Sequence, residues 1–155
     1  MSRSRRSPAG FTLIELMIVI AIIGVIAAIA IPNMIEARKR SNEAHAVATM
    51  KAIHAAQTLF KDRDFDKNGV QDYARNISML SGLIDSSLAT TARRNGYIFS
   101  MYLAGIDYNN SWAMQAIPIG GVGSGAGDRT FWIDDTGVIR SSVSLALPSD
   151  PAIGN

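Results

Sequence analysis

The chain has 155 residues, 48% of them hydrophobic, which is enough for one domain and a membrane segment. It contains no cysteine, so a disulfide framework and a thiolate metal site are both excluded. The formal net charge is +2, but three of the 15 basic residues precede the first apolar run, and the rest of the chain is close to neutral. The composition therefore gives no argument for a nucleic-acid partner, and none is expected.

An almost wholly apolar run extends from Phe11 to Ile31 and is interrupted only by Thr12 and Glu15. About 20 apolar residues in a helix span the hydrocarbon core of a bilayer. The three arginines ahead of the run predict that its N-terminal end stays cytoplasmic and that the rest of the chain lies outside. A secretory signal peptide fits poorly, because its apolar region is shorter and its small-residue cleavage site comes after that region. Here the small residues Ala9 and Gly10 come before it.

Glu15 argues against a plain membrane anchor, because a carboxylate costs roughly 2.5–3.5 kcal/mol at mid-bilayer and an anchor has no use for it. If the chain is cut between Gly10 and Phe11, the new amino group of Phe11 is a second charge at the membrane face. Glu15 of a neighbouring subunit can neutralise that charge, and each group then removes the other's burial penalty. The pattern predicts subunits that stack with a fixed axial offset.

The residues G-F-T-L-I-E with an apolar helix behind them resemble the type IV prepilin signature, which type IV pilins and type II secretion pseudopilins share. The resemblance implies that a prepilin peptidase cuts after Gly10 and N-methylates Phe11, and that Glu15 guides docking. It implies a structural role and no enzyme activity. Before assembly the subunit would lie in the inner membrane with its C-terminal domain in the periplasm. An assembly ATPase and its membrane platform would then build a helical filament of identical subunits.

The same resemblance implies that the helix between Gly24 and Pro32 is often partly unwound in assembled filaments. The sequence agrees, because glycine and proline both weaken helices, and Pro32 cannot donate to the carbonyl one turn back. Many type IV pilins close a C-terminal loop with a disulfide, which this chain cannot do. That departure favours a pseudopilin or another cysteine-free pilin. The part from Gly96 to Ile139 also resembles, less specifically, proteins related to the major pseudopilin.

We expect residues 1–10 to be a leader, residues 11–32 the transmembrane and assembly helix, and residues 33–155 a soluble domain. Residues 33–60 should continue the helix, since they are rich in alanine and lack glycine and proline. One apolar face recurs at helical spacing, and its members are Ala46, Met50, Ile53, Ala56 and Phe60. The basic cluster Arg38-Lys39-Arg40 allows contact with lipid headgroups or with acidic side chains, although a solvated charge run is the simpler interpretation. His45 and His54 are expected to be surface polar residues.

An acidic loop is expected at residues 61–75, where the order D-x-D-x-N-G-x-x-D matches the first part of a calcium loop. The candidate ligands are Asp64, Asp66, Asn68, Asp72 and the carbonyl of Val70, with Gly69 allowing the backbone to reverse. The twelfth position, where an EF-hand has a bidentate glutamate, is Arg75. Either another acid, Asp62 or Asp107, closes the site, or binding is weak. The alternative is a polar turn, since Asp, Asn and Gly form turns anyway.

The C-terminal half predicts one short helix or two turns over Ile77–Ala92, a turn at residues 93–96 and then an antiparallel sheet at residues 97–142. The expected strands are Tyr97–Leu103, Trp112–Ile117, Arg129–Ile133 and Gly137–Ser142. Residues 134–137 are a hairpin signal. The glycine-rich loop at residues 120–127 lacks the ending of a phosphate loop. The tail at residues 144–155 should be irregular.

These elements predict an α+β fold of the type IV pilin kind, in which one long helix packs on a small antiparallel sheet. Its core should bury Ile98, Trp132, Ile133 and Ile139 against Met50, Ile53 and Phe60. Two functions remain open. The first is a filament subunit cut after Gly10, and the second is a membrane-anchored periplasmic module that binds calcium.

Overall fold

The computed structural model describes residues 10–102 and 107–144. Residues 1–9 of the predicted leader, Leu103 and nearly all of the predicted tail lie outside these residues. The chain divides into two compact units, Met1–Glu36 and Ala37–Asn155. The helix α1, Leu13–Asp62, begins in the first unit and ends in the second.

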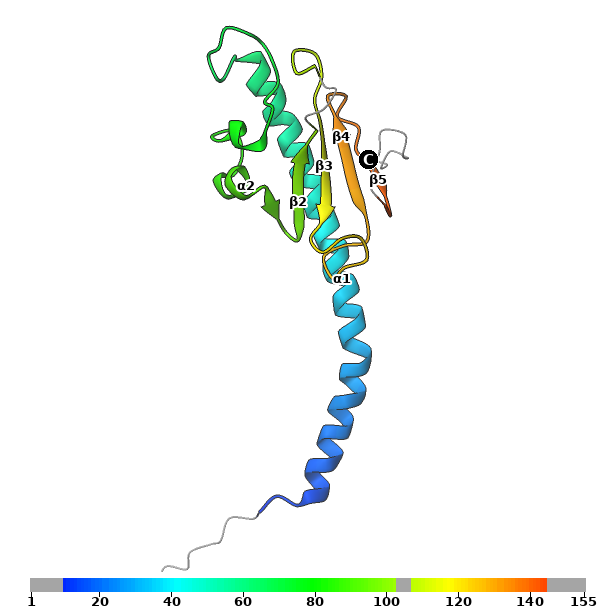
Figure 1. The fold of residues 1–155 in the computed structure, drawn as a ribbon. Coiled ribbons are helices and arrows are strands. Elements are labelled where there is room, and N and C mark those ends of the chain that lie inside the picture. The colour runs from blue at the N-terminus through cyan, green and yellow to red at the C-terminus, as the bar shows by residue number, and fades with distance from the viewer. Residues whose placement is uncertain (1–9, 103–106, 145–155) are drawn as a thin grey trace, which may run out of the picture. The chain divides into compact units, whose positions relative to one another are not determined.

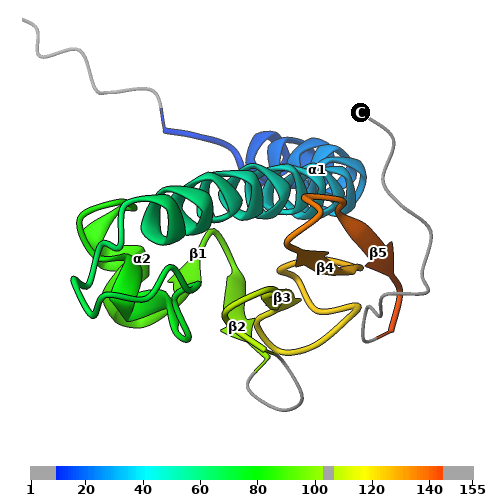
Figure 2. The same cartoon turned by 90° about the horizontal axis from the view of Figure 1, so that it is seen from above.

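The second unit is a sheet with one helical face, as Figures 1 and 2 show. The C-terminal part of α1 lies across one side of a five-stranded antiparallel meander in the order β1-β2-β3-β4-β5. The 3₁₀ helix η1 and the short helix α2 precede the sheet, in the part of the chain for which one short helix or two turns were predicted. The bounds are Ile77–Leu80 for η1, Ser86–Thr91 for α2, Arg93–Arg94 for β1, Tyr97–Met101 for β2, Ala113–Pro118 for β3, Thr130–Asp134 for β4 and Arg140–Ser142 for β5.

The core lies between α1 and the inner face of the sheet. The predicted apolar face of α1 is buried, with Ala46, Met50, Ile53, Ala56 and Phe60 each at most 2% exposed. Strands β2, β3 and β4 contribute alternate residues, as the period of two requires, and Ile139 joins them from just before β5. These inward side chains are Tyr97, Phe99, Met114, Ala116, Phe131, Ile133 and Ile139. The α+β architecture is therefore confirmed.

Two of the predicted core residues lie elsewhere. In β2 the order Tyr-Ile-Phe-Ser-Met places apolar residues on both faces, and the structure turns Tyr97 and Phe99 inward while Ile98 is only half buried. Tyr97 can be buried because its hydroxyl donates to the carbonyl of Arg129 at 2.8 Å. Trp132 is buried, but it packs with Ala113 and Tyr102 in a second, smaller cluster away from α1.

Several predicted boundaries differ from the structure, and two of these differences have clear local reasons. Arg93 and Arg94 form a short strand paired with Ile98 and Tyr97, and only Asn95 and Gly96 make the turn. The last strand begins at Arg140 and not at Gly137. Gly137 has a φ of +75°, which belongs to the hairpin turn, and its amide donates to the carbonyl of Asp134 at 3.0 Å.

Candidate functional site

The N-terminal part of α1 is apolar and largely exposed within the chain. From Phe11 to Ile35 its large apolar side chains are exposed to solvent in the isolated subunit. This helix is long and apolar enough to cross a bilayer, and it is the one such helix among the described residues. An apolar surface of this extent needs lipid or other protein around it. Gly10, the predicted cleavage position, is exposed and non-helical, as a protease substrate must be.

Glu15 closes a capping box at the start of this helix. Its Oε2 accepts hydrogen bonds from the backbone amide of Thr12 at 2.8 Å and from the hydroxyl of Thr12 at 2.7 Å. In return, the amide of Glu15 donates to the hydroxyl of Thr12 at 3.3 Å. This reciprocal pairing satisfies amides that the first helical turn leaves unpaired. Thr12 thus has a role that the sequence interpretation missed, although T-x-x-E before an apolar run was the signal for it.

The second oxygen of Glu15 takes part in no hydrogen bond within the described residues. The capping box therefore uses one carboxylate oxygen and leaves Oε1 available to a donor from outside the chain. The charge of the carboxylate also stays uncompensated, because no ion pair to Glu15 exists in the described part of the chain. This geometry suits a carboxylate that is held in place within its own subunit and neutralised by another.

Gly24 and Pro32 lie within the unbroken helix. The structure assigns α-helix on both sides of each residue. Pro32 lacks an amide hydrogen and leaves the carbonyl of Ala28 without its usual partner, which costs a helix interior about 3 kcal/mol. A Cβ placed on Gly24 meets nothing within 4 Å. In the single subunit the two positions are thus weak points of a continuous helix, and their unwinding in a filament stays a prediction.

The acidic loop follows α1 and is held by its own side chains. The carboxylate of Asp64 accepts from the amide of Asn68 at 3.1 Å and from the amide of Gly69 at 3.0 Å. Asn68 donates its side-chain amide to Asp66 at 2.9 Å and accepts from the amide of Val70 at 2.7 Å. Gly69 has a φ of +82°, the reversal predicted for it.

The acidic residues among the predicted calcium ligands do not form a group that could hold a metal ion. Among the described residues, no group of three or more His, Cys, Asp or Glu side chains is placed to hold a metal ion. Asp72 is buried, with Oδ2 at 3.7 Å from Arg75 and Oδ1 without a hydrogen bond. Asp107, a candidate for closing the site, bonds the amide of Asn109 and the side chain of Asn110. Calcium binding therefore stays a prediction that needs the loop to rearrange.

A polar clamp joins α1 to the glycine-rich loop and was not predicted. Glu43, 7% exposed, accepts from Nε and Nη2 of Arg129 at 2.9 and 2.7 Å and from the amide of Asp128 at 2.9 Å. Lys39 pairs with Asp128 at 2.9 Å, and Asn42 donates to the carbonyl of Ala126 at 2.9 Å. The clamp joins residues more than 80 positions apart, so local patterns carry no signal for it.

Comparison with known proteins identifies the N-terminal segment. The model of the prokaryotic N-terminal methylation motif matches residues 5–31. The chain is 47% identical over 77 residues, half of its length, to the type IV major pilin protein PilA of Myxococcus xanthus, and this covers 34% of that protein. It is 46% identical over 56 residues to the type IV wide pilus major component PilA4 of Thermus thermophilus, covering 36% of the chain and 43% of the relative.

A second class of relative is a secretion protein. The chain is 38% identical over 61 residues to the type II secretion system core protein G of Pseudomonas aeruginosa, which covers 39% of the chain and 43% of that protein. The chain thus spans less than half the length of these relatives, and no solved structure matches it. The N-terminal segment thus carries the prokaryotic N-terminal methylation motif and is similar to type IV pilins and to type II secretion core protein G.

Proposed function

We propose that the chain is a structural subunit of a type IV pilus or of a type II secretion pseudopilus. It is inserted in the inner membrane with its C-terminal domain in the periplasm, cut after Gly10 and N-methylated on Phe11. It then assembles with further copies into a helical filament. Similarity to type IV major pilins and to type II core protein G supports this assignment. Repetition of one head-to-tail contact gives a helical filament.

The observation that carries the proposal is the state of Glu15. A carboxylate near the start of an apolar helix is costly in lipid unless a positive charge approaches it. Its own subunit supplies hydrogen bonds from Thr12 to one oxygen but no positive charge within the described residues. After cleavage, the amino group of Phe11 in a neighbouring subunit supplies that charge next to the free oxygen.

The test separates capping from charge pairing. Glu15→Gln keeps an oxygen that accepts the amide of Thr12 but removes the charge, whereas Thr12→Ala weakens the cap and keeps the charge. In cells with the peptidase and the assembly machinery, Glu15→Gln should lose most filaments, and Thr12→Ala should lose few. Both variants should still insert in the membrane at wild-type levels. Wild-type filament yield from Glu15→Gln would show that the charge of Glu15 has no part in assembly.

The calcium-binding anchor is the alternative function. The relatives are named as pilus and secretion components, and they favour the filament subunit. Bound calcium is compatible with either function, so the ion itself does not separate them. Cleavage after Gly10 separates the two functions, because a membrane anchor does not need to be cut.

A further inference from the structure

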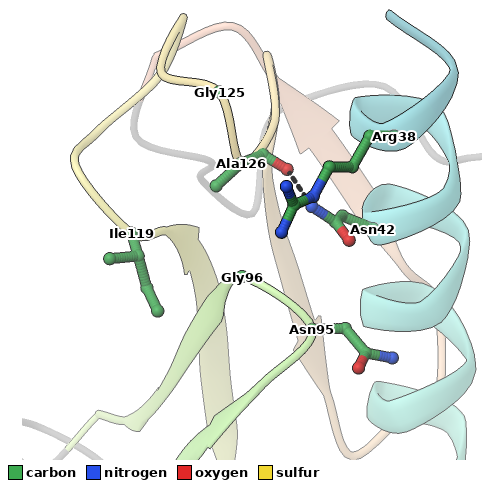
Figure 3. A pocket seen from close by; sticks show the side chains of 7 residues that line it. All are labelled: Arg38, Asn42, Asn95, Gly96, Ile119, Gly125 and Ala126. Carbon is green, nitrogen blue, oxygen red and sulfur yellow. Dashed lines mark hydrogen bonds between the residues drawn. The ribbon is translucent and has the colours of Figure 1, made fainter. Parts of the chain in front are cut away.

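A surface pocket lies between α1, the β1–β2 turn and the glycine-rich loop, as Figure 3 shows. Its volume is about 510 Å³, within the range of roughly 300–1,000 Å³ that is usual for small-molecule sites. The lining residues are Arg38, Asn42, Asn95, Gly96, Ile119, Gly125 and Ala126. The guanidinium of Arg38 extends from α1 toward Ala126 of the loop. Within the described residues, the guanidinium of Arg38 takes part in no hydrogen bond or ion pair.

The loop beside Arg38 is held in place and yet presents apolar side chains outward. The clamp described above fixes the loop through Asp128, Arg129 and the carbonyl of Ala126. Ile119 and Val122 are nevertheless each 40% exposed on it. Arginines and exposed aliphatic residues at one end of a domain are the combination that binds the interface of an anionic membrane.

Arg38 follows the apolar run closely in the sequence. Arg38 follows Ile31, the last residue of the apolar run, by seven positions, which is about 10 Å along a helix. The polar headgroup layer on each side of a bilayer is about 5–8 Å thick. A long arginine side chain reaches phosphate groups from there while its stem stays on apolar surface. Arg40, two residues on, also has no ion pair in the described part of the chain.

We propose that this surface binds the headgroup of an anionic phospholipid while the subunit is still in the membrane. Arg38 contacts the lipid phosphate, the pocket takes the rest of the headgroup, and Ile119 and Val122 enter the interface. The contact rests on the proposed insertion in the membrane but not on filament assembly. It orients the domain on the bilayer and is lost when the subunit leaves the membrane for a filament.

The test uses the full chain in nanodiscs that hold one copy each, in phosphatidylcholine alone or with about one third phosphatidylglycerol. Because the chain has no cysteine, Val122→Cys takes a single spin label. Val138→Cys is the matched control, since Val138 is 37% exposed and lies in the β4–β5 turn. A label at Val25→Cys reports insertion separately, so that failed insertion is not mistaken for a failed lipid contact.

We expect the label at position 122 to lose contact with a water-soluble relaxation agent in the anionic discs, while the label at position 138 does not change. Arg38→Gln should lower the ratio of lipid-contacting to free label about fivefold, and Arg38→Lys should retain most of it. Equal water access at position 122 in both bilayers would overturn the proposal. Protection of position 122 that survives Arg38→Gln would also overturn the proposal. Protection that arises only in discs holding two or more copies would overturn it too, and would assign this surface to contact with another subunit.

Discussion

Replacing Arg129 with leucine should destabilise the C-terminal unit more than replacing its partner, Glu43. The carboxylate of Glu43 is 8% exposed, whereas the side chain of Arg129 is 46% exposed. Arg129→Leu thus leaves a buried carboxylate whose described donor is the amide of Asp128 alone. Glu43→Leu leaves a guanidinium that water can reach. The cost of breaking the pair therefore depends on which side is removed.

The magnitudes follow from these burials. Removing one partner of a buried pair costs about 3–5 kcal/mol, and the half-exposed guanidinium argues for the lower end, about 3 kcal/mol for Arg129→Leu. Glu43→Leu removes charge-assisted hydrogen bonds but leaves only the amide of Asp128 without its hydrogen-bond partner. We expect this variant to lower the free energy of unfolding by about 1–2 kcal/mol. The unit has about 120 residues, so each kcal/mol lowers the melting temperature by about 4 °C. The expected losses are about 12 °C and about 4–8 °C.

Tryptophan fluorescence of the full chain in detergent micelles measures these losses, because Trp112 and Trp132 are both buried in the unit. Arg93→Leu is the control, since this exposed arginine makes no ion pair within the described residues, and it should change stability by less than about 0.5 kcal/mol. The double variant of Arg129 and Glu43 should be more stable than Arg129→Leu alone, because no buried charge remains. Equal costs for the two single variants would refute the assignment of a buried, clamped carboxylate.

Three further predictions concern the same unit. Gly127→Ala should cost about 1–3 kcal/mol because its Cβ would collide with the ring and hydroxyl of Tyr97, whereas Gly125→Ala meets nothing and should be neutral in the same melt. Burial raises the pKa of Tyr97 above its ordinary value near 10, so the unfolded chain loses that proton first. The free energy of unfolding should therefore fall as pH rises through about 10, and less steeply in Tyr97→Phe; equal slopes would contradict this. Millimolar calcium should raise the melting temperature of the wild type but not of Asp64→Asn, and no shift in either would end the calcium prediction.

The long helix and the fold class could be predicted because their signals are local. An apolar run of membrane length, an alanine-rich continuation and an apolar face at helical spacing each lie within one stretch of chain. The hairpin at residues 134–137 was likewise readable from its turn residues. Thr12 was readable too, as the first residue of a capping box, but it was overlooked because Glu15 was judged only by its cost in lipid.

The features that could not be predicted from the sequence depend on contacts between distant residues. The prediction for the inner face of β2 named Ile98, whereas Tyr97 and Phe99 lie inward, and the hydrogen-bond partner that lets Tyr97 be buried is the carbonyl of Arg129, 32 positions away. The pairing of Glu43 with Arg129 is separated by 86 positions. The pocket beside Arg38 needs three segments at once, and neither their composition nor their order indicates that they meet.

The most direct test of the central claim is the intact mass and N-terminal sequence of the protein taken from its own membranes. The account predicts a chain that begins at Phe11 and is one methyl group heavier than the cut sequence. A chain that still begins at Met1, in cells where the peptidase is active, would contradict prepilin processing and with it the role of the chain as a filament subunit.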